Sequence, residues 1–83
     1  MDIKEIIGKY IVNNFLLEEG LNTINDDDSL LDMGIIDSTG VLELVAFIEE
    51  TFEIRVEDEE LIPDNLDSVN RLVDYIKSKL KSR

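Results

Sequence analysis

The chain of 83 residues contains no cysteine and no histidine. The lack of cysteine excludes disulfides, thiolate metal ligands and a cysteine nucleophile. The lack of histidine removes the commonest general base and the commonest metal ligand of proteins. A self-contained enzyme would have to work with carboxylates, lysine and tyrosine alone. We therefore expect a non-catalytic domain without a metal site, which depends on chemistry supplied from outside.

Long apolar stretches are also missing. No run approaches the roughly 20 residues that a membrane-spanning helix needs, and no signal-peptide pattern opens the sequence. We therefore expect a cytoplasmic protein with no transmembrane segment. Hydrophobic residues make up 43% of the chain, which is enough for a folded domain and too many for a disordered one. The length predicts a single domain over residues 1–83.

Positive charge is scarce and unevenly distributed. The chain has 8 basic and 20 acidic residues, and its formal net charge is −12. Residues 18–60 carry 15 acidic side chains against Arg55 alone, a net of −14, whereas residues 61–83 have a net of +2. Such a field repels nucleic acid and anionic lipid and attracts basic protein surfaces. The expected partners are therefore proteins with basic patches.

Apolar residues recur at helical spacing in three segments. Residues 2–17, 38–52 and 67–80 are each predicted to form a longer helix. Residues 57–62 predict one short acidic helical turn ended by Pro63, and Asp67 is expected to cap the last helix. Residues 53–56 alternate like a strand but are too few to build a sheet. The pattern predicts an all-α four-helix bundle of three longer helices and one short helix.

A long connection, residues 18–37, joins the first two longer helices. Loops of this length in compact domains are often functional. We expect it to be ordered, because seven apolar side chains are available to pin it to the helices: Leu21, Ile24, Leu30, Leu31, Met33, Ile35 and Ile36. The loop delivers Asp37-Ser38 to the start of an acidic amphipathic helix, so Ser38 is expected at an exposed tip.

The pair Asp37-Ser38 alone has a simpler explanation, because both residue types are favoured helix caps. Asp67-Ser68 precedes the last helix in the same way. The surroundings separate the two pairs. Gly34-Ile35-Ile36 precedes the first pair and an acidic helix follows it, whereas the second pair begins a basic helix.

The segment Gly34-Ile35-Ile36-Asp37-Ser38, followed by Glu43-Leu44, resembles the attachment motif of acyl and peptidyl carrier proteins. The similarity covers nearly the whole chain and includes residues 49–52 and 73–76. It implies a four-helix bundle in which Ser38 carries a covalent phosphopantetheine arm, with Asp37 flanking it. A phosphopantetheinyl transferase would supply the arm from coenzyme A. The arm would then hold an acyl or aminoacyl group as a thioester.

Two residues depart from the pattern of fatty acid synthesis carriers, namely Thr39 and Gly40. The Asp-Ser-x-Gly arrangement is similar to D-alanyl carrier proteins of cell-wall modification. The segment 63–68 resembles free-standing carriers served by an adenylate-forming ligase, so a monomeric carrier loaded by an acyl- or aminoacyl-adenylating ligase is favoured. Fatty acid, polyketide and nonribosomal peptide biosynthesis all stay open as pathways.

Residues on the outer face of the second helix are predicted to dock partner enzymes, which include the transferase, the ligase, and acyltransferases or synthases with basic patches. The predicted docking residues are Thr39, Glu43, Ala46, Phe47, Glu49 and Glu50. Their acidic side chains would steer basic patches and raise association rates more than affinity. Such steering weakens with salt.

Two other functions stay open. The acidic run Asp26-Asp27-Asp28 suggests a calcium loop, but Leu30 and Leu31 occupy places where the EF-hand template requires a ligand or glycine. The second alternative is an acidic helical interaction domain that leaves Ser38 unmodified and binds partners through Glu43, Phe47 and Glu50. Loading from coenzyme A discriminates between the carrier and both alternatives.

Overall fold

The computed structural model describes residues 2–16 and 25–82 of the chain. Helix α1 (Ile3–Ile11) continues into a π-helical turn, η1 (Val12–Leu16), and α2 (Ser38–Phe52) follows the loop. A 3₁₀ turn, η3 (Asp58–Glu60), precedes the short α3 (Pro63–Leu66) and the long α4 (Val69–Lys81). The described residues contain no strand. The prediction of an all-α bundle with three longer helices and one short helix is confirmed.

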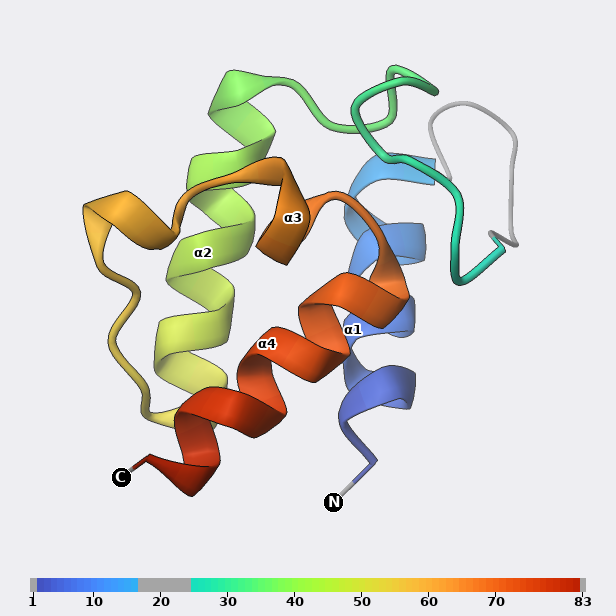
Figure 1. Cartoon of the computed structure of the whole chain (residues 1–83). Coiled ribbons are helices and arrows are strands. Elements are labelled where there is room, and N and C mark those ends of the chain that lie inside the picture. The colour runs from blue at the N-terminus through green and yellow to red at the C-terminus, as the bar shows by residue number, and fades with distance from the viewer. Residues whose placement is uncertain (1, 17–24, 83) are drawn as a thin grey trace.

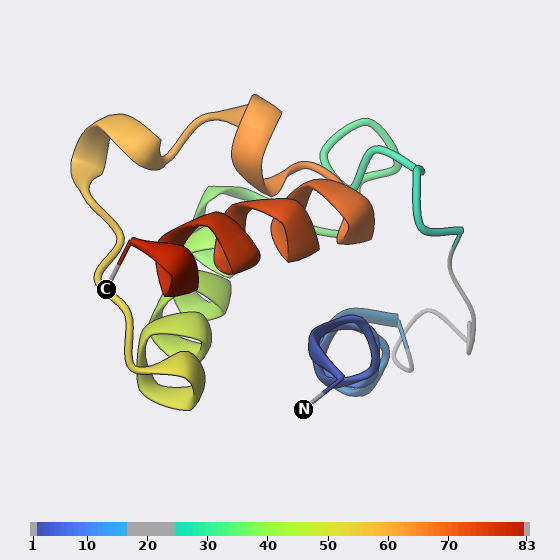
Figure 2. The ribbon, with the colours of Figure 1, turned by 60° about the horizontal axis from the view of Figure 1, so that its bottom comes forward.

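The helices form one bundle whose two ends differ. Helices α1 and α2 run in opposite directions, and residues 25–37 cross the end of the bundle at which α2 begins (Figure 1). Figure 2, in which α1 is seen nearly end-on, shows α4 lying across the pair formed by α1 and α2. Helix α4 contacts both α1 and α3. The first residue of α2 therefore lies at the end of the molecule that the loop covers.

One hydrophobic core joins the helices. Each longer helix turns an apolar stripe inward, as an amphipathic helix does when its partners cover one face. The largest fully buried side chains are Ile7, Ile11, Leu16, Leu30, Leu44, Ile48, Val69, Leu72 and Ile76. Leu30 comes from the loop, so the loop takes part in the core. No helix within residues 2–16 and 25–82 is long and apolar enough to cross a membrane.

The first helix differs from the prediction at its end. Asp2 caps α1 by accepting the Glu5 N–H at 3.1 Å, as its place before an apolar stripe suggests. The last described turn is π-helical rather than α-helical, and Leu17, the predicted end, lies outside the described residues. The wider turn still buries Leu16 completely.

The segment after α2 corrects two predictions. Pro63 does not end a helical turn but begins α3, because proline costs nothing at a position whose N–H has no helical partner. The acidic turn before it is the 3₁₀ helix η3, not a helix over residues 57–62. Helix α4 is capped by Ser68, which accepts the Arg71 N–H at 3.1 Å, and not by Asp67.

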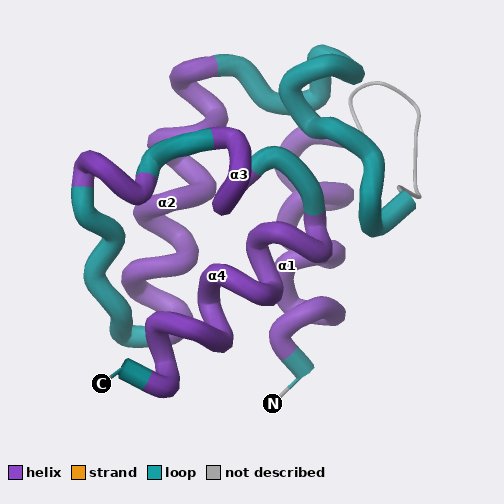
Figure 3. The backbone as a smooth tube through the Cα atoms, viewed as in Figure 1, coloured by secondary structure: helices purple, strands orange, loops and turns teal. Residues whose placement is uncertain are grey.

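Residues 25–37, before Ser38, form turns and bends without a helix (Figure 3). Only some of their apolar side chains are buried. Leu30 and Ile36 are buried and Ile35 is half-buried, as expected. Leu31 and Met33 are 42% and 51% exposed, so the prediction that they pin the loop is wrong. Consecutive turns cannot point every side chain inward, and these two face solvent. Leu21 and Ile24 lie outside the described residues.

Candidate functional site

Ser38 is the first residue of α2, and it is exposed. Asp37 precedes it in an extended conformation, with φ −105° and ψ −173°. The Asp37 Oδ1 atom accepts the Gly40 N–H at 2.8 Å, and the Asp37 carbonyl oxygen accepts the Val41 N–H at 2.9 Å. Because Asp37 supplies the cap, the helix start does not require the Ser38 hydroxyl. That hydroxyl is accessible for chemistry.

Gly40, two residues after Ser38, is buried because the chain packs closely behind the site. A Cβ atom at this position would lie 3.0 Å from Phe15 Cε1 and 3.3 Å from Ile36 Cγ2. The missing side chain lets η1 and the loop approach the first turn of α2. Packing therefore accounts for the unusual glycine in the sequence after Ser38.

A small apolar cavity lies beside the site. It measures about 70 Å³ and is lined by the loop, α2 and the segment that contains α3, through residues that include Leu30, Ile36, Val41, Ile62 and Leu66. Pockets that hold a drug-sized ligand measure about 300–1,000 Å³, so this cavity is small by comparison.

Four of the six predicted docking residues are exposed on α2: Thr39, Glu43, Ala46 and Glu50. The other two have contacts within the domain. Phe47 is half-buried and stacks on Tyr10 with ring centroids 4.0 Å apart. The Glu49 Oε2 atom accepts the Val56 N–H at 2.9 Å, which ties the end of the following segment to α2. The four exposed residues lie along the outer face of α2, which begins at Ser38.

The sequence reasoning missed Leu42 on this face. Leu42 is 63% exposed, more than the other large hydrophobic residues with high exposure, which are Leu31, Met33 and Ile62. It lies one helical turn after Ser38 and Thr39, so their side chains share one face. The signal was available, because Leu42 falls outside the buried stripe that Leu44 and Ile48 define.

The second Asp-Ser pair has the reverse arrangement. Ser68 is only 3% exposed and its Oγ atom caps α4. Asp67 instead reaches the loop, where its Oδ1 atom accepts the Leu31 N–H at 2.9 Å. The Ser68 hydroxyl is thus buried and engaged in capping, whereas Ser38 is exposed and does not cap its helix.

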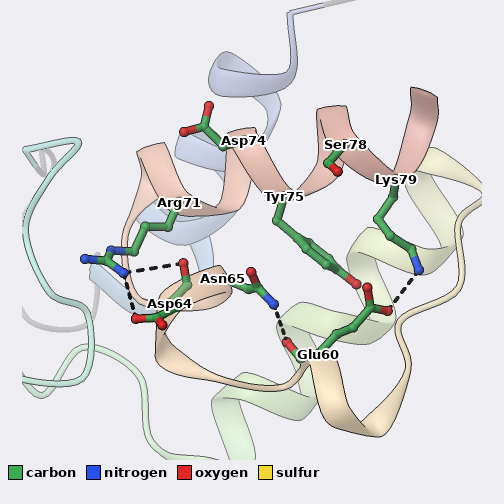
Figure 4. Close-up of a pocket in the computed structure, with 8 residues that line it drawn as sticks. All are labelled: Glu60, Asp64, Asn65, Arg71, Asp74, Tyr75, Ser78 and Lys79. Carbon is green, nitrogen blue, oxygen red and sulfur yellow. Dashed lines mark hydrogen bonds and ion pairs between the residues drawn. The ribbon is translucent and has the colours of Figure 1, made fainter. Parts of the chain in front are cut away.

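A polar pocket of about 350 Å³ lies between α4 and the segment that contains η3 and α3 (Figure 4). Lys79 Nζ donates to Glu60 Oε1 at 2.9 Å, and Arg71 pairs with Asp64. The Tyr75 hydroxyl is buried without a hydrogen-bond partner among the described residues. Its burial, followed by the proximity and charge of the Glu60 carboxylate, raises the pKa of Tyr75 above its ordinary value. Four of the ionic side chains of this pocket are thus paired, Glu60 with Lys79 and Asp64 with Arg71, which indicates that they hold the segment 58–66 against α4.

The carboxylates do not form a metal site in the described part of the chain. No group of three or more aspartate, glutamate, histidine or cysteine side chains among residues 2–16 and 25–82 is arranged to hold a metal ion. Asp26 pairs with Lys4, and Asp27 Oδ1 accepts a hydrogen bond from Asn70 Nδ2 at 2.6 Å. These two members of the acidic run are engaged within the domain.

Comparison with known proteins gives a family match and several relatives. Residues 9–76 match the family described as "Phosphopantetheine attachment site". The chain is 35% identical over 76 residues to the D-alanyl carrier protein of Streptococcus sanguinis, which covers 92% of each chain. It is 37% identical over 62 residues to the D-alanyl carrier protein of Streptococcus uberis, covering 75% of this chain and 77% of the relative. It is 38% identical over 79 residues to the acyl carrier protein of Buchnera aphidicola, covering 95% of this chain and 90% of the relative.

Proposed function

Since the chain belongs to the phosphopantetheine-attachment family of carrier proteins, we propose that it carries the arm on Ser38 and presents a thioester-bound acyl or aminoacyl group to partner enzymes. The family implies a covalently attached phosphopantetheine group. The observation that carries the choice of residue is the exposed Ser38 hydroxyl at the first position of α2, next to a separate capping residue. The domain itself is non-catalytic in this proposal.

The surroundings of Ser38 fit a phosphate-linked group. The hydroxyl is exposed, and a phosphate there would lie at the N-terminal end of α2, where the helix dipole favours negative charge. During loading, Ser38 Oγ loses its proton and forms a bond to phosphorus, while the bond from phosphorus to the adenosine bisphosphate part of coenzyme A breaks. The transferase supplies the catalysis, because this chain has no histidine or cysteine.

The bound arm supplies the thiol on which the cargo is held, and the chain itself has no cysteine to do so. The chain's contribution is to hold the attachment point on a rigid helix and to leave space around it. Capping by Asp37 and close packing at Gly40 fix the first turn of α2. Exposure of Ser38 and Thr39 leaves its outer side open to an enzyme.

We propose a small cargo, an aminoacyl or short acyl group, loaded by an adenylate-forming ligase. Two of the relatives are named D-alanyl carrier proteins. The cavity of about 70 Å³ beside the site is consistent with this, because it cannot enclose a long fatty chain without expansion of the bundle. The relative named acyl carrier protein supports a fatty acyl cargo as the second candidate.

The docking surface of the proposed carrier combines an exposed apolar side chain with acidic ones. Thr39, Glu43, Ala46 and Glu50 form a stripe along the exposed face of α2, and Leu42 lies beside this stripe, next to Thr39 and Ala46. The apolar side chain supplies contact area, and the acidic side chains steer a partner of the opposite charge. The transferase, the ligase and the enzymes that use the cargo would each present a basic patch here.

The proposal is tested by loading. Incubation of the folded protein with coenzyme A and a broad-specificity phosphopantetheinyl transferase should add one phosphopantetheine group, and peptide mapping should locate it on Ser38. Intact-mass spectrometry measures the addition. Modification of Ser68 would contradict the choice of Ser38 as the attachment residue, and no modification of folded protein would return the chain to the role of an interaction domain.

A further inference from the structure

The loop before Ser38 is held by the residues that begin α4, and most of the contacts come from Asp67. The Asp67 carbonyl oxygen accepts the Leu30 N–H at 2.7 Å. Its side chain accepts twice more, from Leu31 N–H to Oδ1 at 2.9 Å and from Ser29 Oγ to Oδ2 at 2.5 Å. One residue thus binds three successive loop residues that lie at least 36 positions away in sequence.

These contacts continue to the attachment site through the backbone. The Leu30 carbonyl oxygen accepts the N–H groups of Ile35 and Ile36, at 3.0 and 3.3 Å. Ile36 is buried and directly precedes Asp37, the cap of α2. A backbone hydrogen-bond path therefore runs from the Asp67 carbonyl oxygen through Leu30 to Ile36, and the Asp67 carboxylate holds Ser29 and Leu31 on either side of Leu30.

Apolar burial supports only part of the loop at this point. Leu31 and Met33 face solvent, so Leu30, Ile35 and Ile36 are the apolar side chains of residues 29–36 that pack inward. Segments with few buried contacts open locally more often than the rest of a fold. The polar contacts of Asp67 therefore add support to the part of this loop whose apolar side chains face solvent.

We propose that Asp67 is a positioning residue for the modification of Ser38, acting through the loop and the cap of α2. This inference rests on the proposed function of Ser38. Asp67 itself does not touch the attachment site. Its carboxylate holds Ser29 and Leu31, and these contacts fix the turn from which Ile36 and Asp37 enter α2. Asp67 belongs to the pair Asp67-Ser68, which resembles an attachment motif, and it thereby supports the proposed attachment site at Ser38.

The test measures transferase kinetics and native-state amide exchange on the same variants. Asp67→Ala should lower kcat/KM for loading about tenfold or more, since a displacement of ~1 Å at a reacting group can cost about a hundredfold. Exchange should become faster at the Leu31, Ile35 and Ile36 amides, while the Leu72 amide in α4 keeps its protection. Asp67→Asn should restore most of the rate, because its carbonyl oxygen can still accept from Leu31.

Two further variants complete the experiment. Asp64→Ala is the matched control, because Asp64 is an exposed neighbour whose side chain pairs with Arg71 and not with the loop. It should load at the normal rate. Ser29→Ala removes one contact of Asp67, together with the bond that the Ser29 hydroxyl accepts from the Asp32 N–H, and keeps the Leu31 contact of Asp67. It should give a smaller loss, so the proposal stays testable if Asp67→Ala does not fold.

Two results would overturn the proposal: normal loading by folded Asp67→Ala, or slow loading without faster exchange at Ile35 and Ile36. The second result would mean that Asp67 contacts the transferase itself. Failure of the proposed function is separate, because the unsubstituted protein would then not be loaded at all. The exchange measurement would still decide whether Asp67 orders the segment before Ser38.

Discussion

Asp37-Ser38 and Asp67-Ser68 begin two helices of the same molecule with opposite division of roles. In the first pair the aspartate caps the helix and the serine is exposed, whereas in the second the serine caps and is 3% exposed. The helix start has moved by one residue relative to the dipeptide. This shift decides which serine is exposed, and nothing within the two residues themselves reveals it.

The surroundings explain the shift. The Asp37 side chain accepts the Gly40 N–H, three residues further along the chain, and so caps its own helix. The Asp67 carboxylate instead accepts hydrogen bonds from Ser29 and Leu31 of the loop, and Ser68 caps α4. Tertiary contacts therefore override local preference at the second pair. The following predictions test how far the two serines differ.

The largest expected effect is the loss of loading in Ser38→Ala. This variant should not accept phosphopantetheine at all, while its denaturation midpoint in urea should stay close to that of the unsubstituted protein because Ser38 is exposed and does not cap. Mass spectrometry and urea titration give the two readouts. Residual loading of Ser38→Ala would remove the distinction between the serines.

Charge reversal next to the first pair should have the second largest effect. Glu43→Lys or Glu50→Lys should slow loading about tenfold at low salt, because these side chains are exposed on the helix that Ser38 begins. The difference should shrink as the salt concentration rises. Asp74→Lys, an equal change at an exposed position of α4, is the control. An equal loss there would assign the effect to total charge.

Ser68→Ala should affect stability and not loading. Loss of the cap that accepts the Arg71 N–H should lower the free energy of unfolding by about 1 kcal/mol, with the rate of loading changed less than twofold. Asp37→Ala should be destabilised to a similar extent, since it caps the other helix. Both values come from urea titration. Unaltered stability of Ser68→Ala would contradict the capping role.

The smallest expected effects concern two glycines, of which Gly40 packs behind the first pair and Gly8 of α1 does not. Gly8→Ala should raise the free energy of unfolding by roughly 0.5–1 kcal/mol, because no other atom lies within 4 Å of the added Cβ. Gly40→Ala should lack this gain, since its Cβ would lie 3.0 Å from Phe15 Cε1. Thermal or urea unfolding compares the two. Equal stabilisation by both substitutions would show that the site tolerates a side chain at Gly40.

Much of this architecture follows from local sequence. Helix α2 begins at Ser38 and ends at Phe52 as predicted, because its cap and its apolar stripe lie within the segment itself. The predicted cap of α4 was wrong by one residue, because Asp67 bonds to residues that are distant in sequence. The predicted role of Pro63 was wrong because proline can either end or begin a helix, and the fold decides which of the two occurs.

The candidate site was partly predictable for the same reason. The exposure of Ser38, Thr39, Glu43, Ala46 and Glu50 follows from the helical period. The contact of Glu49 with the Val56 N–H depends on how the chain turns after α2, where Glu53 adopts a left-handed conformation with φ 55°. Sequence periodicity carries no information about such a turn.

The position of Tyr10, stacked on Phe47 of α2, makes it an intrinsic optical probe in this molecule. The chain contains two tyrosines and no tryptophan. Tyr10 also donates a hydrogen bond from its hydroxyl to the Glu43 carbonyl oxygen at 3.3 Å, so one of the two fluorophores lies against the helix that is proposed to meet partner enzymes. Energy transfer from that tyrosine to a tryptophan of an arriving enzyme would report complex formation without any attached dye.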